Sequence, residues 1–107
     1  IMAVAATFAA ANADVLAPDA TEALADRVGK LTGATTAFGV PVLDYLGNGR
    51  FARGVVENAT KYRDERLMER LRREETLTVE TLAVTDLTEI TGADMVAALD
   101  RMLANLR

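Results

Sequence analysis

Apolar residues recur every three or four positions in four stretches of this chain, which is the spacing of one face of an α-helix. The first stretch, residues 1–13, is rich in alanine and has Phe8 as its bulky anchor. The second begins at Pro18, a residue suited to the first position of a helix, and the acidic Asp19 complements the helix dipole there. The apolar stripe of this second helix consists of Leu24, Val28 and Leu31.

The third stretch is predicted to begin near residues 48–50 and to end at about residue 72. Its apolar positions are Phe51, Val55, Ala59, Tyr62, Leu67 and Leu71. Thr91 is the expected N-cap of the last helix, and Asp94 is its acidic partner three positions on, which is close to a capping box. The positions of this helix that we expect to face inward are Met95 or Val96, Leu99, Met102, Leu103 and Leu106.

The remaining segments have no clear helical period. Residues 14–17 and 34–46 are expected to be connections, the second of them anchored to the core by its apolar side chains. Residues 76–79 alternate threonine with apolar side chains, which is typical of a short strand, although this segment also suits a helical turn. We therefore predict an all-α fold, a small four-helix bundle forming one domain over residues 1–107, with a short strand or irregular segment near residues 76–84.

Composition excludes several classes of chemistry. The chain has no Cys and no His, so it cannot form thiolate or zinc-thiolate sites or a histidine-based catalytic triad. Its net charge of −4 argues against broad nucleic-acid affinity, and no stretch approaches the ~20 apolar residues of a membrane span. A helix-turn-helix interpretation of residues 87–99 is disfavoured because its second helix would expose Asp94 and Asp100. We expect no catalytic residue, no metal site, no nucleic-acid partner and no membrane insertion.

The candidate functional site is the stretch from Gly47 to Arg53, in which a Gly-Asn-Gly turn leads into the third helix. Arg50 and Arg53 fall in the first turn, where the helix dipole is positive and backbone N–H groups have no helical partner. A phosphate beside them would satisfy both arginines and the open helix end. The alternative is ordinary surface charge, because Arg53 also begins a ladder of alternating sign with Glu57, Lys61 and Glu65. The mixed-charge run at residues 63–75 is expected to be a solvated helix end or a subunit-contact edge.

Three segments of the chain carry a resemblance to a known family: Gly47-Asn48-Gly49-Arg50-Phe51-Ala52-Arg53, Leu16-Ala17-Pro18-Asp19-Ala20 and Leu87-Thr88-Glu89-Ile90-Thr91-Gly92-Ala93-Asp94-Met95. In this order they resemble the C-terminal lid of AAA+ ATPases, in the group that contains the CbbX Rubisco activase, the SpoVK sporulation ATPase and the EccA type VII (ESX) secretion ATPase. The chain is most similar to the last of these. One departure is Gly54, where the group usually has Asn.

The resemblance implies that Arg50 is the sensor-2 arginine, which reaches the phosphates of ATP bound on the preceding large subdomain. It implies that Arg53 contacts the nucleotide or a subunit interface. It also implies that Gly47 and Gly49 give the backbone the freedom that lets Arg50 approach the nucleotide. The implied function is that of a nucleotide-sensing lid in a cytoplasmic, hexameric ATPase that couples ATP hydrolysis to the remodelling or secretion of a protein substrate. The groups that hydrolyse ATP and hold Mg²⁺ would then precede Ile1. We therefore expect a fragment of a longer ATP hydrolase, inactive alone.

A second function from a different class also fits the residues. The chain could be a stand-alone helical adaptor that binds a protein partner through the mixed-charge helix of residues 61–75. The two hypotheses differ in what precedes the chain, because only the first requires a phosphate-binding Walker A loop upstream.

Overall fold

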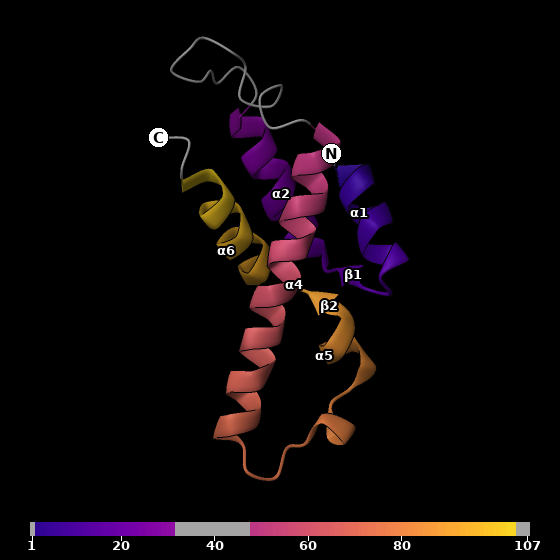
Figure 1. Ribbon diagram of the computed structural model, residues 1–107, viewed down its shortest axis with the longest axis vertical. Helices are drawn as coiled ribbons and strands as arrows, with labels where there is room; N and C mark the ends of the chain where they lie inside the picture. Colours follow the sequence, from indigo (N-terminus) through magenta and orange to yellow (C-terminus); the bar gives the residue numbers. More distant parts are fainter. Residues whose placement is uncertain (1, 32–47, 105–107) are drawn as a thin grey trace.

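The computed structural model describes residues 2–31 and 48–104, which form a bundle of helices (Figure 1). Its longer helices are α1 (Met2–Ala11), α2 (Pro18–Leu31), α4 (Asn48–Arg73) and α6 (Gly92–Leu103). A 3₁₀ turn, η1 (Val79–Thr81), and the short helix α5 (Val84–Thr88) lie between α4 and α6. The prediction of an all-α bundle of four helices is confirmed. The structure does not describe the connection expected at residues 34–46. Gly47 and Leu106 also lie outside the described residues.

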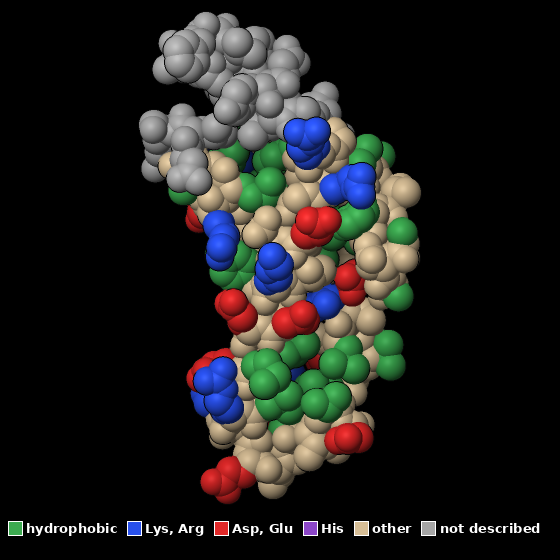
Figure 2. Space-filling view, viewed as in Figure 1, with side chains coloured by type: hydrophobic (Ala, Val, Ile, Leu, Met, Phe, Trp, Pro, Cys, Tyr) green, Lys and Arg blue, Asp and Glu red, His purple; other side chains and the backbone are tan. Residues whose placement is uncertain are grey.

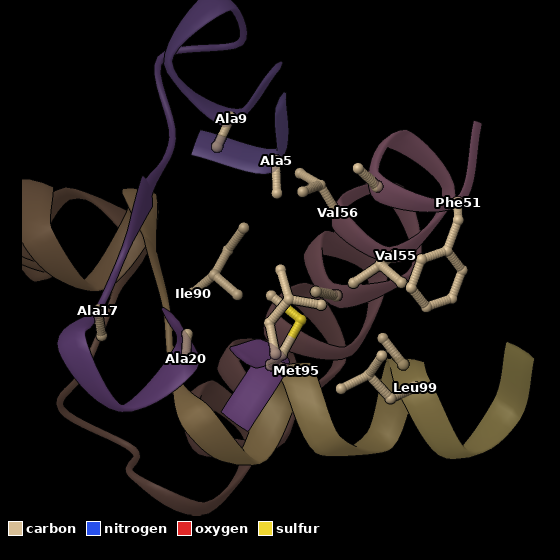
Figure 3. Close-up of a cluster of buried hydrophobic side chains, with 14 residues drawn as sticks. Ala5, Ala9, Ala17, Ala20, Phe51, Val55, Val56, Ile90, Met95 and Leu99 are labelled. Atoms are coloured by element: carbon tan, nitrogen blue, oxygen red, sulfur yellow. The ribbon is translucent and has the colours of Figure 1, made fainter. Parts of the chain in front are cut away.

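Helix α4 is the longest helix, and the others pack around its N-terminal half (Figure 1). α1 and α6 contact α4 directly, and α2 packs against α6. The core lies where these helices meet (Figure 3). The largest fully buried side chains there are Phe51, Leu24, Ile90, Met95, Leu99, Val55 and Val56. α4 extends well beyond this core, and near its C-terminus Arg70 contacts Asp86 of α5, in the segment that leads to α6.

The predicted apolar faces agree with the burial of the side chains. In α4 the positions expected to face inward are all buried or half-buried. In α6, Met95 is fully buried whereas Val96 is 41% exposed, so Met95 is the inward residue of the two alternatives. α1 presents Ala5 and Ala9 to the core, with Phe8 half-buried beside them. Small side chains on this face leave room for α1 and α4 to approach closely.

A two-stranded parallel sheet joins the segment after α1 to the segment before α6. β1 (Val15–Leu16) pairs with β2 (Glu89–Ile90), with Val15 opposite Glu89 and Leu16 opposite Ile90. The N–H of Ala17 also donates a hydrogen bond to the carbonyl of Ile90 at 2.9 Å. The connection predicted at residues 14–17 therefore contains a strand that the sequence did not reveal, because two residues are too few to show an alternating pattern.

Residues 76–84, all of which the structure describes, contain a helical turn and no strand. The N–H of Thr78 donates to Oγ1 of Thr81, and that hydroxyl donates to the carbonyl of Thr78, both at 2.9 Å. These local bonds use the backbone groups that a strand would need for pairing. Of the two alternatives for this segment, the irregular one is therefore formed.

The end of α1 contains a left-handed residue that is not glycine. Ala13 has a φ of 60°, and the N–H of Asp14 reaches back to the carbonyl of Ala9 at 2.8 Å. This is the Schellman arrangement, which normally favours glycine at the left-handed position. The turn reverses the chain and directs Asp14 toward α4, where its carboxylate binds an arginine.

Candidate functional site

Arg50 lies where predicted, in the first turn of α4, which begins at Asn48. Arg53 is the sixth residue of this helix and so lies in its second turn, one turn later than predicted. Both side chains are exposed, and the first turn contains no acidic residue. Within the described part of the chain, the guanidinium of Arg50 makes no ion pair or side-chain hydrogen bond. Its positive charge is therefore added to the positive end of the helix dipole without compensation.

An open hollow of about 420 Å³ surrounds these arginines. Its lining residues are Gly49, Arg50, Arg53, Gly54 and Glu57. The two cations precede the carboxylate along the helix, so an anion placed at the open helix end meets Arg50 before it meets Glu57. The hollow therefore fits an anionic group at its outer end, while Glu57 limits how far along the helix such a group can extend.

Arg53 connects this hollow to helix α1. Its Cζ atom lies 5.4 Å from the ring centroid of Phe8, within the range of a cation–π interaction. Arg53 and Phe8 also line a second, apolar hollow of about 410 Å³, together with Ala3, Val4, Thr7 and Ala11. No ion pair joins Arg53 to Glu57 among the described residues. The first step of the expected charge ladder is therefore absent there, and Phe8 orients Arg53 instead.

The glycines of the site differ in their surroundings. A Cβ atom at Gly49 would meet nothing within 4 Å, so nothing in the described structure requires glycine there. A Cβ atom at Gly54 would lie 2.9 Å from Cε of Met102, the terminal methyl group of a side chain on α6. The Met102 side chain therefore packs directly over Gly54 and would have to shift if a larger residue stood there. Gly47 lies outside the described residues.

Further along α4, Arg63 forms a buried ion pair that the sequence interpretation missed. Its Nη1 atom lies 2.7 Å from Oδ1 of Asp14, and its Nε atom donates to Asp64 at 3.2 Å. Burial by itself lowers the pKa of Arg63, but the hydrogen bond and charge of Asp14, helped by Asp64, outweigh it and raise the pKa above its ordinary value. The expectation of a solvated helix end is wrong for this residue.

The sequence did contain a signal for the burial of Arg63. It lies four positions after Ala59 and four before Leu67, both of which are buried, and this is the spacing of the apolar face. A charged side chain at a core-facing position needs a partner. The sequence does not say which carboxylate that partner is.

Arg66 joins α4 to the start of α6. Its Nε and Nη2 atoms donate to the two carboxylate oxygens of Asp94 at 3.2 and 3.0 Å. Asp94 also forms the predicted capping box, in which the N–H of Thr91 donates to its carboxylate and its own N–H donates to the Thr91 hydroxyl. Burial raises the pKa of Asp94, but the hydrogen bonds from Arg66 and Thr91 outweigh it and lower the pKa.

Four of the arginines of α4 therefore have two different environments. Arg63 and Arg66 bind carboxylates of neighbouring segments and hold α1 and α6 against α4. Arg50 and Arg53 make no such ion pair within the described part of the chain, and they remain open to a ligand. In the same part of the chain, no group of three or more His, Cys, Asp or Glu side chains could hold a metal ion. None of its helices is long and apolar enough to span a bilayer.

Comparison with known proteins places nearly the whole chain in one family. The chain is 39% identical over 101 residues to the ESX-1 secretion system protein EccA1 of Mycobacterium leprae (strain TN), covering 88% of this chain and 17% of that protein. It is 34% identical over 86 residues to the ESX-2 secretion system protein EccA2 of Mycobacterium tuberculosis (strain ATCC 25618 / H37Rv), covering 80% of this chain and 14% of that protein.

The chain thus spans less than a fifth of the length of either relative. No solved structure matches it significantly. The family model of the AAA lid domain matches residues 1–105, nearly the whole chain. The chain therefore belongs to the AAA lid domain family.

Proposed function

We propose that this chain is the nucleotide-sensing lid of an AAA+ ATPase that serves type VII secretion. Membership of the AAA lid domain family supports the first part of the proposal, and similarity to two ESX secretion proteins supports the second. In this proposal a large subdomain holds ATP and Mg²⁺, the lid closes over the nucleotide, and the complete protein is a cytoplasmic hexamer that remodels or secretes a protein substrate.

One observation carries the nucleotide-sensing role. Arg50 is an exposed cation at the positive end of α4 and has no carboxylate partner among the described residues. This arrangement is unfavourable in the isolated lid, because the arginine and the helix dipole repel each other. A bound phosphate removes the repulsion and gains charge-assisted hydrogen bonds. Arg53, held by Phe8 beside the same hollow, supplies a second cation.

The structure of α4 suggests how contact at this end reaches the rest of the lid. Arg63 and Arg66 tie α4 to Asp14 and Asp94, so α1, α4 and α6 are joined by more than apolar packing. When Arg50 binds a phosphate, the helices therefore rotate together as one rigid body. ATP supplies the charge that Arg50 binds, and Arg50 stabilises the charge that develops on the terminal phosphates.

The test is ATP turnover by the full-length protein. Arg50→Ala should lower the turnover rate by about 10²-fold, as expected when one charge-stabilising donor is removed from a transition state. Lys61→Ala is the matched control, because Lys61 is an exposed cation on the same helix that lines neither hollow. Both variants should unfold at the temperature of the wild type. Turnover by Arg50→Ala within about twofold of the wild type, at unchanged stability, contradicts the proposal.

The adaptor hypothesis has less support from the described residues. It relies on the charges of residues 61–75, but Arg63, Arg66 and Arg70 in that run are bound to carboxylates of the same chain. The reading frame that precedes this chain separates the two functions. A phosphate-binding loop followed by a helix upstream supports the lid, and its absence supports the adaptor.

A further inference from the structure

The end of the molecule opposite Arg50 exposes several large apolar side chains. Met68 on α4, Val79 in η1, and Val84 and Leu87 in α5 are exposed by 54, 56, 74 and 38%. Figure 2 shows hydrophobic side chains gathered over this part of the molecule, between the C-terminal half of α4 and the segment that follows it. We call these four residues, together with Glu75 and Glu80, the distal surface. Apolar side chains gathered on a surface and bordered by polar ones are typical of interaction sites.

The charge of this region is strongly one-sided. Residues 74–89 contain five acidic side chains and no basic one. Arg70 of α4 lies 3.6 Å from carboxylates of both Glu74 and Asp86 and so offsets part of this charge. Glu75 and Glu80 make no ion pair with any other described residue and are exposed. The distal surface therefore combines apolar side chains with carboxylates that have no partner within the described chain.

The distal surface is also held in place. Leu82 is buried, and Arg70 links both ends of the segment from Glu74 to Asp86 to α4. A partner that binds here does not have to order the segment first, which reduces the entropy cost of association.

We propose that the distal surface docks a basic, amphipathic segment of a partner protein. Apolar side chains of that segment would cover Val79 and Val84, and its Lys or Arg side chains would face Glu75 and Glu80. A second copy of the same surface is a poor partner, because it would place carboxylates against carboxylates. Met68, the residue of this surface that lies on α4, is about 27 Å from Arg50 along the helix, at 1.5 Å per residue. This interaction is therefore separate from nucleotide sensing and goes beyond it.

Photocrosslinking in the full-length protein tests the proposal. A photoreactive amino acid replaces Val84, and the same residue at Val96 serves as control, because Val96 is an exposed valine on α6 outside the distal surface. After irradiation in the source cells, the crosslinked peptides are sequenced by mass spectrometry. The expected result is a crosslink from position 84 to a segment of another protein that contains apolar residues and has a net positive charge. The yield of this crosslink should be well above the yield at position 96.

Charge reversal then tests the recognition itself. Glu75→Lys with Glu80→Lys should lower the crosslinking yield at position 84 by about tenfold. Glu22→Lys, an exposed acid on α2, should leave the yield unchanged, and ATP turnover should be the same in all variants. A crosslink to a second copy of this chain, a crosslink to an acidic segment, a yield no higher than at position 96, or a yield unaffected by the charge reversal would each overturn the proposal.

Discussion

Arg63 of α4 and Asp14, which follows α1, form a buried ion pair with 2.7 Å between Nη1 and Oδ1. Their side chains are only 9 and 11% exposed, although 49 residues separate them in the sequence. The pair is positioned by the left-handed turn at Ala13 on one side and by the core-facing position of Arg63 on the other. It therefore specifies how α1 lies on α4.

Removing one partner of this pair should be strongly destabilising. Asp14→Ala leaves the buried Arg63 guanidinium with the exposed Asp64 as its remaining carboxylate partner, and we expect the free energy of unfolding to fall by about 3 kcal/mol. Arg63→Met added to Asp14→Ala should restore part of this loss, because no buried charge then remains. Urea denaturation measures both. Asp26→Ala, which removes an exposed acid paired with Lys30, should cost less than about 1 kcal/mol. Equal losses for Asp14→Ala and Asp26→Ala would contradict the argument.

The stability of the fold should depend on pH through Asp94. Folding lowers the pKa of this carboxyl, so its contribution is fully present above the unfolded pKa of about 3.9 and is lost as the pH falls through the folded pKa. Asp94→Asn keeps the size of the side chain but removes the charge that Arg66 binds. The difference in the free energy of unfolding between wild type and Asp94→Asn should therefore be largest near neutral pH and should shrink below pH 4. A difference that is constant between about pH 2 and pH 7 would rule out this linkage.

Ala13 offers a direct test of backbone strain. Its φ of 60° is unfavourable for a residue with a Cβ atom and normal for glycine. Ala13→Gly should therefore raise the free energy of unfolding by about 0.5–1 kcal/mol. Ala10→Gly, at an exposed helical position of α1, should lower it by a similar amount. Thermal or urea unfolding measures whether each variant is more or less stable than the wild type. If both changes lower the free energy of unfolding, Ala13 is not strained.

A substitution at Gly49 should affect ATP turnover without lowering the stability of the fold. A Cβ atom there meets nothing within 4 Å, so Gly49→Ala should leave the free energy of unfolding unchanged or raise it by up to about 1 kcal/mol. If the backbone at Gly49, in the first turn of α4, approaches a phosphate on the large subdomain, the added methyl group should nevertheless lower ATP turnover in the full-length protein. Gly29→Ala on α2 is the matched control, since a Cβ there also meets nothing and Gly29 lies outside the hollow. Unchanged turnover in both variants would show that no such approach occurs.

The sequence alone was sufficient for the local features of this protein. Helical spacing predicted the four helices and most of their buried faces, because an apolar stripe is a property of one segment. The capping box of Thr91 and Asp94 was equally predictable, since its two residues are three positions apart. The exposed Arg50 in the first turn of α4 followed from the helical pattern that begins near residue 48.

Tertiary structure decided the contacts between segments that are distant in the chain. The pairing of β1 with β2, the contact of Arg53 with Phe8 and the burial of Arg63 against Asp14 all join such segments. The apolar spacing around Arg63 indicates that it faces the core, but only packing decides that Asp14 is the carboxylate it binds. The sequence by itself determined which faces of the helices are apolar, and the assembled bundle decided which charges are used to hold it together and which remain open to a ligand.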